Sequence, residues 1–75
     1  MTKLPAVSGT TEVVRPLERA GFVQAGVKGS HCKLRSHERH LTVIVPLHRG
    51  ALPQGTLASI LRQAKMTADD LHLLL

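Results

Sequence analysis

Hydrophobic residues recur at two different periods along this chain, and the change of period divides it into helical and extended segments. Residues 8–11 are rich in side chains that favour a helix N-cap. Val13 and Leu17 follow at helical spacing and Gly21 marks a stop, so a helix is predicted between these points. Pro16 lies inside this helix, where it removes one backbone donor and disfavours regular geometry.

Two stretches carry the patterns of β-strands. At residues 22–27 apolar side chains alternate with polar or small ones, which predicts a half-buried strand with Val23, Ala25 and Val27 on one face. Residues 40–45 form a β-branched, apolar run, which predicts a well-buried strand. Each strand is therefore expected to contribute side chains to a core.

A third strand is predicted between them, directly after a tight turn at residues 28–30. Residues 31–35 alternate again, and Cys32 and Leu34 fall on one face. The opposite, solvent-accessible face carries His31, Lys33 and Arg35. The alternation therefore aligns one histidine with two positive charges.

The last third of the chain predicts two helices. After a loop over residues 47–54, Thr56 is the expected N-cap of a helix. Its apolar stripe comprises Leu57, Ile60, Leu61 and Ala64. Thr67 and Asp70 have the spacing of a capping box, which predicts a short final helix. That helix carries Leu71, Leu74 and Leu75.

The order helix, three strands, helix, helix predicts an α+β domain. Short connections favour a three-stranded antiparallel sheet with the helices packed on one face. Residues 8–75 are predicted to form this single domain, and residues 1–7 are predicted to be a flexible N-terminal arm because they lack periodicity and contain a proline.

Charge and composition narrow the range of possible functions. Ten Lys and Arg residues against five Asp and Glu give a formal net charge of +5, which favours a polyanionic partner. Phe22 is the one aromatic residue, so a platform that stacks single-stranded bases is not expected. Cys32 is the single cysteine, which suits a reducing cytoplasm, and no apolar run is long enough to span a membrane.

The candidate chemistry lies in the turn Lys28-Gly29-Ser30-His31. Histidine exchanges protons near neutral pH, and lysine supplies a fixed positive charge. A motif this short is weak evidence, and its simplest interpretation is a β-turn followed by an exposed histidine. The rest of the chain has to decide between these interpretations.

Four motifs in a fixed order resemble the HicA family of bacterial toxins, small ribonucleases of type II toxin–antitoxin systems (YcfA-like proteins). The motifs are Leu17-Glu18-Arg19-Ala20-Gly21-Phe22, Lys28-Gly29-Ser30-His31, Val45-Pro46-Leu47-His48 and Gly55-Thr56-Leu57-Ala58-Ser59-Ile60-Leu61-Arg62-Gln63-Ala64. Each is modest alone, but together they are specific and cover about residues 8–75.

The resemblance implies a fold similar to the double-stranded-RNA-binding domain (dsRBD), cleavage of mRNA that stops translation, and a HicB-type antitoxin that covers the active site. The catalytic histidine of the family lies in Gly-Ser-His, which corresponds to His31. Two positions depart from the family pattern. Gly26 stands near the place where many members carry an arginine, and Pro16 lies in a helix that usually lacks proline.

A ribonuclease without metal or cofactor needs a base, an acid and positive charge around the phosphate. His31 can serve as base or acid, and Gly29 and Ser30 can direct backbone N–H groups at a phosphate. The side chains expected to neutralise phosphates are Lys28, Lys33 and Arg35. A second proton-transfer group is not identified, and His48 is more simply a loop residue that caps or packs.

Two alternatives remain at this stage. The same basic face could belong to a non-catalytic, dsRBD-like RNA-binding module that recognises RNA by shape. A metal site is the other alternative, but its candidate ligands match no compact zinc spacing, and Cys32 lies on the apolar face of its strand. These ligands would be Cys32, His37, His40 and His48.

Overall fold

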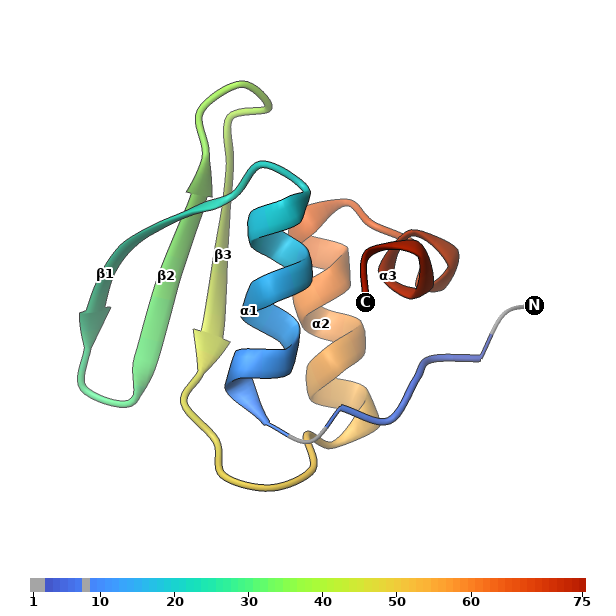
Figure 1. The fold of residues 1–75 in the computed structure, drawn as a ribbon. Helices are drawn as coiled ribbons and strands as arrows, with labels where there is room; N and C mark the ends of the chain where they lie inside the picture. The colour runs from blue at the N-terminus through green and yellow to red at the C-terminus, as the bar shows by residue number, and fades with distance from the viewer. Residues whose placement is uncertain (1–2, 8) are drawn as a thin grey trace.

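The computed structural model describes residues 3–7 and 9–75 and has the predicted α-β-β-β-α-α order (Figure 1). The sheet is antiparallel with strand order β1-β2-β3, so β2 is central. The elements are α1 (Thr10–Arg19), β1 (Val23–Lys28), β2 (His31–Ser36), β3 (Leu41–Pro46), α2 (Gln54–Ala64) and α3 (Ala68–Leu74). The prediction of an α+β domain with a three-stranded antiparallel sheet is confirmed.

The hydrophobic core lies between the sheet and the helices, which occupy one side of it (Figure 1). From β2 the core receives Cys32 and Leu34, as the alternation predicted, and from β3 it receives Val43 and Val45. None of the described helices covers the opposite face of the sheet, and we call this face the open face. The candidate site residues of β2 therefore lie on a sheet that is packed against helices on its other face.

The segment before α1 contributes to this core. Val7 is buried, and its carbonyl oxygen accepts a hydrogen bond from the N–H of Leu52 at 2.9 Å. The predicted domain boundary at residue 8 stays a prediction, and Met1, Thr2 and Ser8 lie outside the described residues. Helix α1 continues through Pro16, which is itself buried.

The prediction that β1 is half-buried is wrong, because all six of its residues are exposed. β1 is an edge strand at the outer side of the sheet (Figure 1), and Val23 and Val27 remain 61% and 60% exposed. A bulge between Gln24 and Gly26 also breaks the simple alternation. Consequently Val27 pairs with Cys32 on the helix side, whereas Gly26 and Val23 lie on the open face.

Three smaller expectations also need correction. β3 is not buried throughout, because it is an edge strand and Ile44, on the open face, is 39% exposed. Helix α2 begins at Gln54 with Pro53 as N-cap, so Thr56 lies inside its first turn. Leu75 follows α3 and is exposed, whereas the predicted stripe of α2 is buried in full.

The predicted capping box at the start of α3 is confirmed. The Asp70 carboxylate accepts a hydrogen bond from the Thr67 N–H at 2.9 Å, and the Thr67 hydroxyl accepts one from the Asp70 N–H at 3.1 Å. The bond from the Thr67 backbone holds the pKa of Asp70 below its ordinary value, with smaller contributions from the Thr67 side chain and from Arg39. The capping box is therefore strongest when Asp70 is ionised.

This capping box predicts a loss of stability in acid. A carboxyl group whose pKa is lower in the folded state stabilises that state above its unfolded pKa, and the stabilisation disappears as the pH falls through the folded value. We expect Asp70→Asn to be less stable than the wild type near neutrality, and the two proteins to converge below about pH 4. Thermal unfolding across this range measures the effect. Glu18→Gln, at an exposed position of α1, is the matched control, and parallel curves for Asp70→Asn and the wild type would contradict the prediction.

Candidate active site on the open face of the sheet

The strand register arranges the open face as three rows, each with one residue from β1, β2 and β3. Because side chains that lie opposite each other in paired strands share a face, the members of each row are neighbours. The rows are Val23–Arg35–Thr42, Gly26–Lys33–Ile44 and Lys28–His31–Pro46. Every row therefore has a basic residue or a histidine at its centre, on β2.

The turn beside His31 is short, and strand pairing and a hydrogen bond fix its position. Gly29 has φ of 58°, a conformation that glycine adopts readily and that two-residue hairpin turns require at their first position. Lys28 and His31 pair across this turn. The N–H of Leu47 donates to the carbonyl oxygen of Ser30 at 2.7 Å, which ties the turn to the segment that follows β3.

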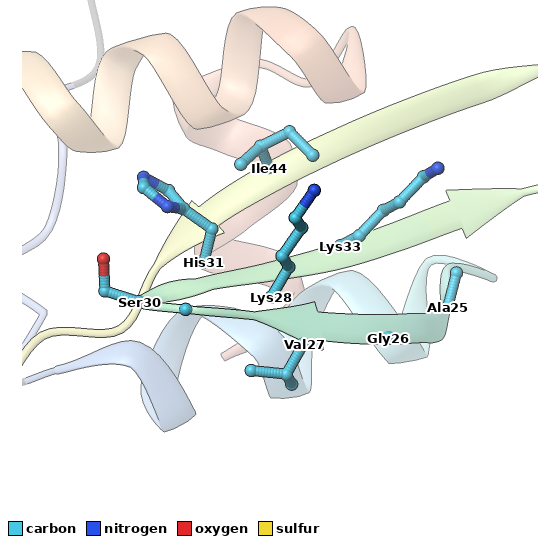
Figure 2. Close-up of a pocket in the computed structure, with 9 residues that line it drawn as sticks. Ala25, Gly26, Val27, Lys28, Ser30, His31, Lys33 and Ile44 are labelled. Atoms are coloured by element: carbon cyan, nitrogen blue, oxygen red, sulfur yellow. The ribbon is translucent and has the colours of Figure 1, made fainter.

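The side chains of the site point to solvent on one side of the sheet. Figure 2 shows Lys28, His31, Lys33 and Ile44 on this side and Val27 on the other. They surround a depression of about 620 Å³ whose described lining contains no aspartate or glutamate. Arg35 is half-buried because its guanidinium donates to the Thr42 hydroxyl at 2.8 Å. The open face is thus a positively charged surface with one histidine.

The structure brings the predicted site residues together. Of the six, all but Arg35 line the depression, and Arg35 lies two rows from His31 on the same face. The residues in the depression are Lys28, Gly29, Ser30, His31 and Lys33. Gly26 and Ile44 share a row with Lys33 and were not predicted as site residues. The sequence marked Gly26 only as a departure from the family pattern, and an isoleucine in a predicted strand gives no signal of a site.

His48 is not among the residues that line this depression. Its N–H donates to the Thr10 hydroxyl at 2.6 Å, and its ring nitrogen Nδ1 lies 3.4 Å from the carbonyl oxygen of Gly50. The Thr10 hydroxyl donates in turn to the carbonyl oxygen of Pro46 at 2.9 Å. His48 therefore belongs to the loop that packs on the start of α1, in agreement with the simpler interpretation.

The candidate metal ligands are spread over separate parts of the fold. Cys32 is buried on the helix side of the sheet, and His37 and His40 lie in the turn between β2 and β3. Within residues 3–7 and 9–75, no three histidine, cysteine or acidic side chains gather in a way that could hold a metal ion. The chemistry available on the open face is proton transfer by His31 together with charge stabilisation by its neighbours.

The fold and this face define a small, basic α+β domain that presents one histidine beside a glycine-containing turn. Residues 10–66 match the family model of the HicA toxin of bacterial toxin–antitoxin systems. The chain belongs to the HicA toxin family. A comparison with curated proteins finds none that matches this chain. None of the described helices is long and apolar enough to cross a membrane.

Proposed function

We propose that this HicA toxin is a metal-independent endoribonuclease that cleaves mRNA and thereby blocks translation. The observation that carries the proposal is the position of His31, exposed on the same face as Lys28 and Lys33 in a depression whose described lining contains no acidic residue. Positive charge attracts the phosphate backbone of RNA, and an exposed imidazole can reach a ribose hydroxyl. The substrate and the site of action are then inside the cell.

The proposed reaction uses the 2′-hydroxyl of the RNA as nucleophile. His31 removes the proton of this hydroxyl while the 2′-oxygen attacks the adjacent phosphorus. The bond from phosphorus to the 5′-oxygen breaks, and the leaving oxygen takes a proton from water. Lys28 and Lys33 stabilise the additional negative charge on the phosphate, together with backbone N–H groups of the turn at Gly29 and Ser30. The products are a 2′,3′-cyclic phosphate and a 5′-hydroxyl.

The proposed inhibitor is a HicB-type antitoxin that covers His31. Family membership implies an antitoxin partner, and the open face offers it a positively charged surface of Lys28, Lys33 and Arg35. Carboxylates opposite these residues would speed association and fix the register of the complex. A protein bound there excludes RNA from the histidine.

The experiment that tests the mechanism is cleavage of RNA by the purified toxin in excess chelator. Because neither the nucleophile nor the base in this reaction is held by an ion, we expect the cleavage rate to stay within about twofold of the rate without chelator. Gel analysis of the products measures the rate, and end-group chemistry identifies the cyclic phosphate. Loss of cleavage with chelator and its recovery with zinc or magnesium would overturn the mechanism.

A further inference from the structure

Gly26, which has no side chain, is one of the residues that line the depression beside His31. Gly26 lies opposite Lys33 in the middle of the three rows, and Lys28, two residues further along β1, begins the row that contains His31. A Cβ atom at Gly26 would meet no other atom within 4 Å, so the space above this residue is open. A side chain here would therefore fill the floor of the depression.

The backbone at this point is built for glycine. Gly26 has φ of 138°, in a region that L-residues rarely adopt, and it follows directly on the bulge of β1. Bulges frequently occur beside functional sites, where they redirect the residues that follow. Here the bulge allows Val23 and Lys28, five residues apart, to lie on the same face, with Gly26 between them.

The surroundings of Gly26 combine charge with a small apolar surface. Lys28 and Lys33 flank it on two strands, and Ile44 completes the row on β3 (Figure 2). The rows of Gly26 and His31 are two residues apart along β2, which corresponds to roughly 6.6 Å. This is comparable to the separation of consecutive phosphates along an RNA strand, so one nucleotide can span the two rows.

We propose that the depression over Gly26 holds one nucleoside of the RNA, next to the phosphate attacked at His31. This rests on the proposed ribonuclease function. The ribose and base lie on the exposed backbone of Gly26 and against Ile44, and Lys28 and Lys33 contact the phosphates on either side. A volume of about 620 Å³ lies within the range of small-molecule sites. Gly26 then determines the position of the bound RNA in the depression.

The test compares Gly26→Ala with Gly21→Ala. Gly21 also has a positive φ, 102°, and open space at its Cβ position, but it lies between α1 and β1 and does not line the depression. Both substitutions impose similar backbone strain, and thermal unfolding checks that both proteins fold. Each is placed in the His31→Ala protein, so that binding of short homopolymer RNAs is measured without cleavage.

We expect Gly26→Ala to weaken RNA binding about tenfold or more relative to Gly21→Ala, because one methyl group in a filled pocket has an effect of this size. An RNA that lacks the base at one ribose should bind the protein with Gly26 less tightly than intact RNA does. The binding of this abasic RNA should also be much less sensitive to Gly26→Ala. Equal RNA affinity of the two alanine variants would overturn the proposal. So would a Gly26→Ala effect that is the same with and without the base.

Two further outcomes distinguish the nucleoside site from the proposed ribonuclease function and from a site for an acidic protein segment. If the wild type does not cleave RNA but Gly26→Ala still weakens RNA binding in a base-dependent way, the nucleoside site stands and the ribonuclease function fails. If Gly26→Ala weakens binding of a poly-glutamate peptide and leaves RNA binding unchanged, the depression serves an acidic protein segment and the proposal is wrong.

Discussion

His31→Ala should lower the rate of RNA cleavage by about 10²–10⁴-fold, the usual loss when a positioned proton-transfer group is removed. The same substitution should abolish growth arrest in cells that lack the antitoxin. We expect the fold to survive, because the His31 side chain is exposed on the open face and contributes nothing to the core. Cleavage by the purified proteins and growth after induction measure the two effects.

The matched control for this prediction is His37→Ala. His37 is equally exposed but lies in the turn between β2 and β3, at the far end of β2 from His31. It should keep cleavage and toxicity near wild-type levels. If His31→Ala is as toxic as the wild type, His31 has no part in the mechanism. If both the wild type and His31→Ala are harmless and bind RNA equally, the domain is a non-catalytic RNA-binding module.

Replacing Lys33 and Arg35 by glutamate should weaken RNA binding by about 100-fold, because placing like charges together costs several kcal/mol. Binding of the antitoxin should weaken in the same variant, since both partners are expected to use the open face. Higher salt should weaken RNA binding more steeply than antitoxin binding, because phosphate contacts release counterions. A competition titration of labelled RNA against antitoxin at two salt concentrations measures all three effects.

A second charge-reversed variant controls for net charge. Arg15→Glu with Arg62→Glu also replaces two cations by two anions, but on exposed positions of α1 and α2. It should weaken RNA binding far less than the Lys33 and Arg35 variant. Equal losses in the two variants would show that net charge, and not the open face, governs binding. A ternary complex of toxin, antitoxin and undisturbed RNA would place the inhibitory contact on another surface.

The sequence predicted well those elements whose two sides differ in environment. β2 is covered by helices on one face and open on the other, so its alternation identified both the core residues and the face of His31. The stripe of α2 was equally clear because the helix packs along one side. The capping box of α3 is a local interaction between Thr67 and Asp70, and local interactions leave their pattern in short stretches of sequence.

Edge strands were harder to predict from the sequence. Periodicity shows which side chains share a face of the sheet, but it does not show whether another element covers that face. Val23 and Val27 alternate like core residues, yet both are exposed, because Val23 lies on the open face and Val27 lies on an edge strand. The bulge that separates their faces depends on pairing with β2, which a single strand does not encode. For the same reason Ile44 became visible as part of the site only when the three strands were paired, and only then did Gly26, known from the sequence as a departure from the family pattern, join the site.

The hydrogen bond from Leu47 to Ser30 has a consequence for how the protein folds as it is synthesised. A two-stranded hairpin is marginally stable by itself, so residues 23–36 need the later strand and helix before the turn at Ser30 is held. At roughly 5–20 residues per second, the ribosome takes about two seconds or more to proceed from His31 to the end of α2. The turn beside His31 therefore reaches its final position late in synthesis, after the segment that contains Leu47 has left the ribosome.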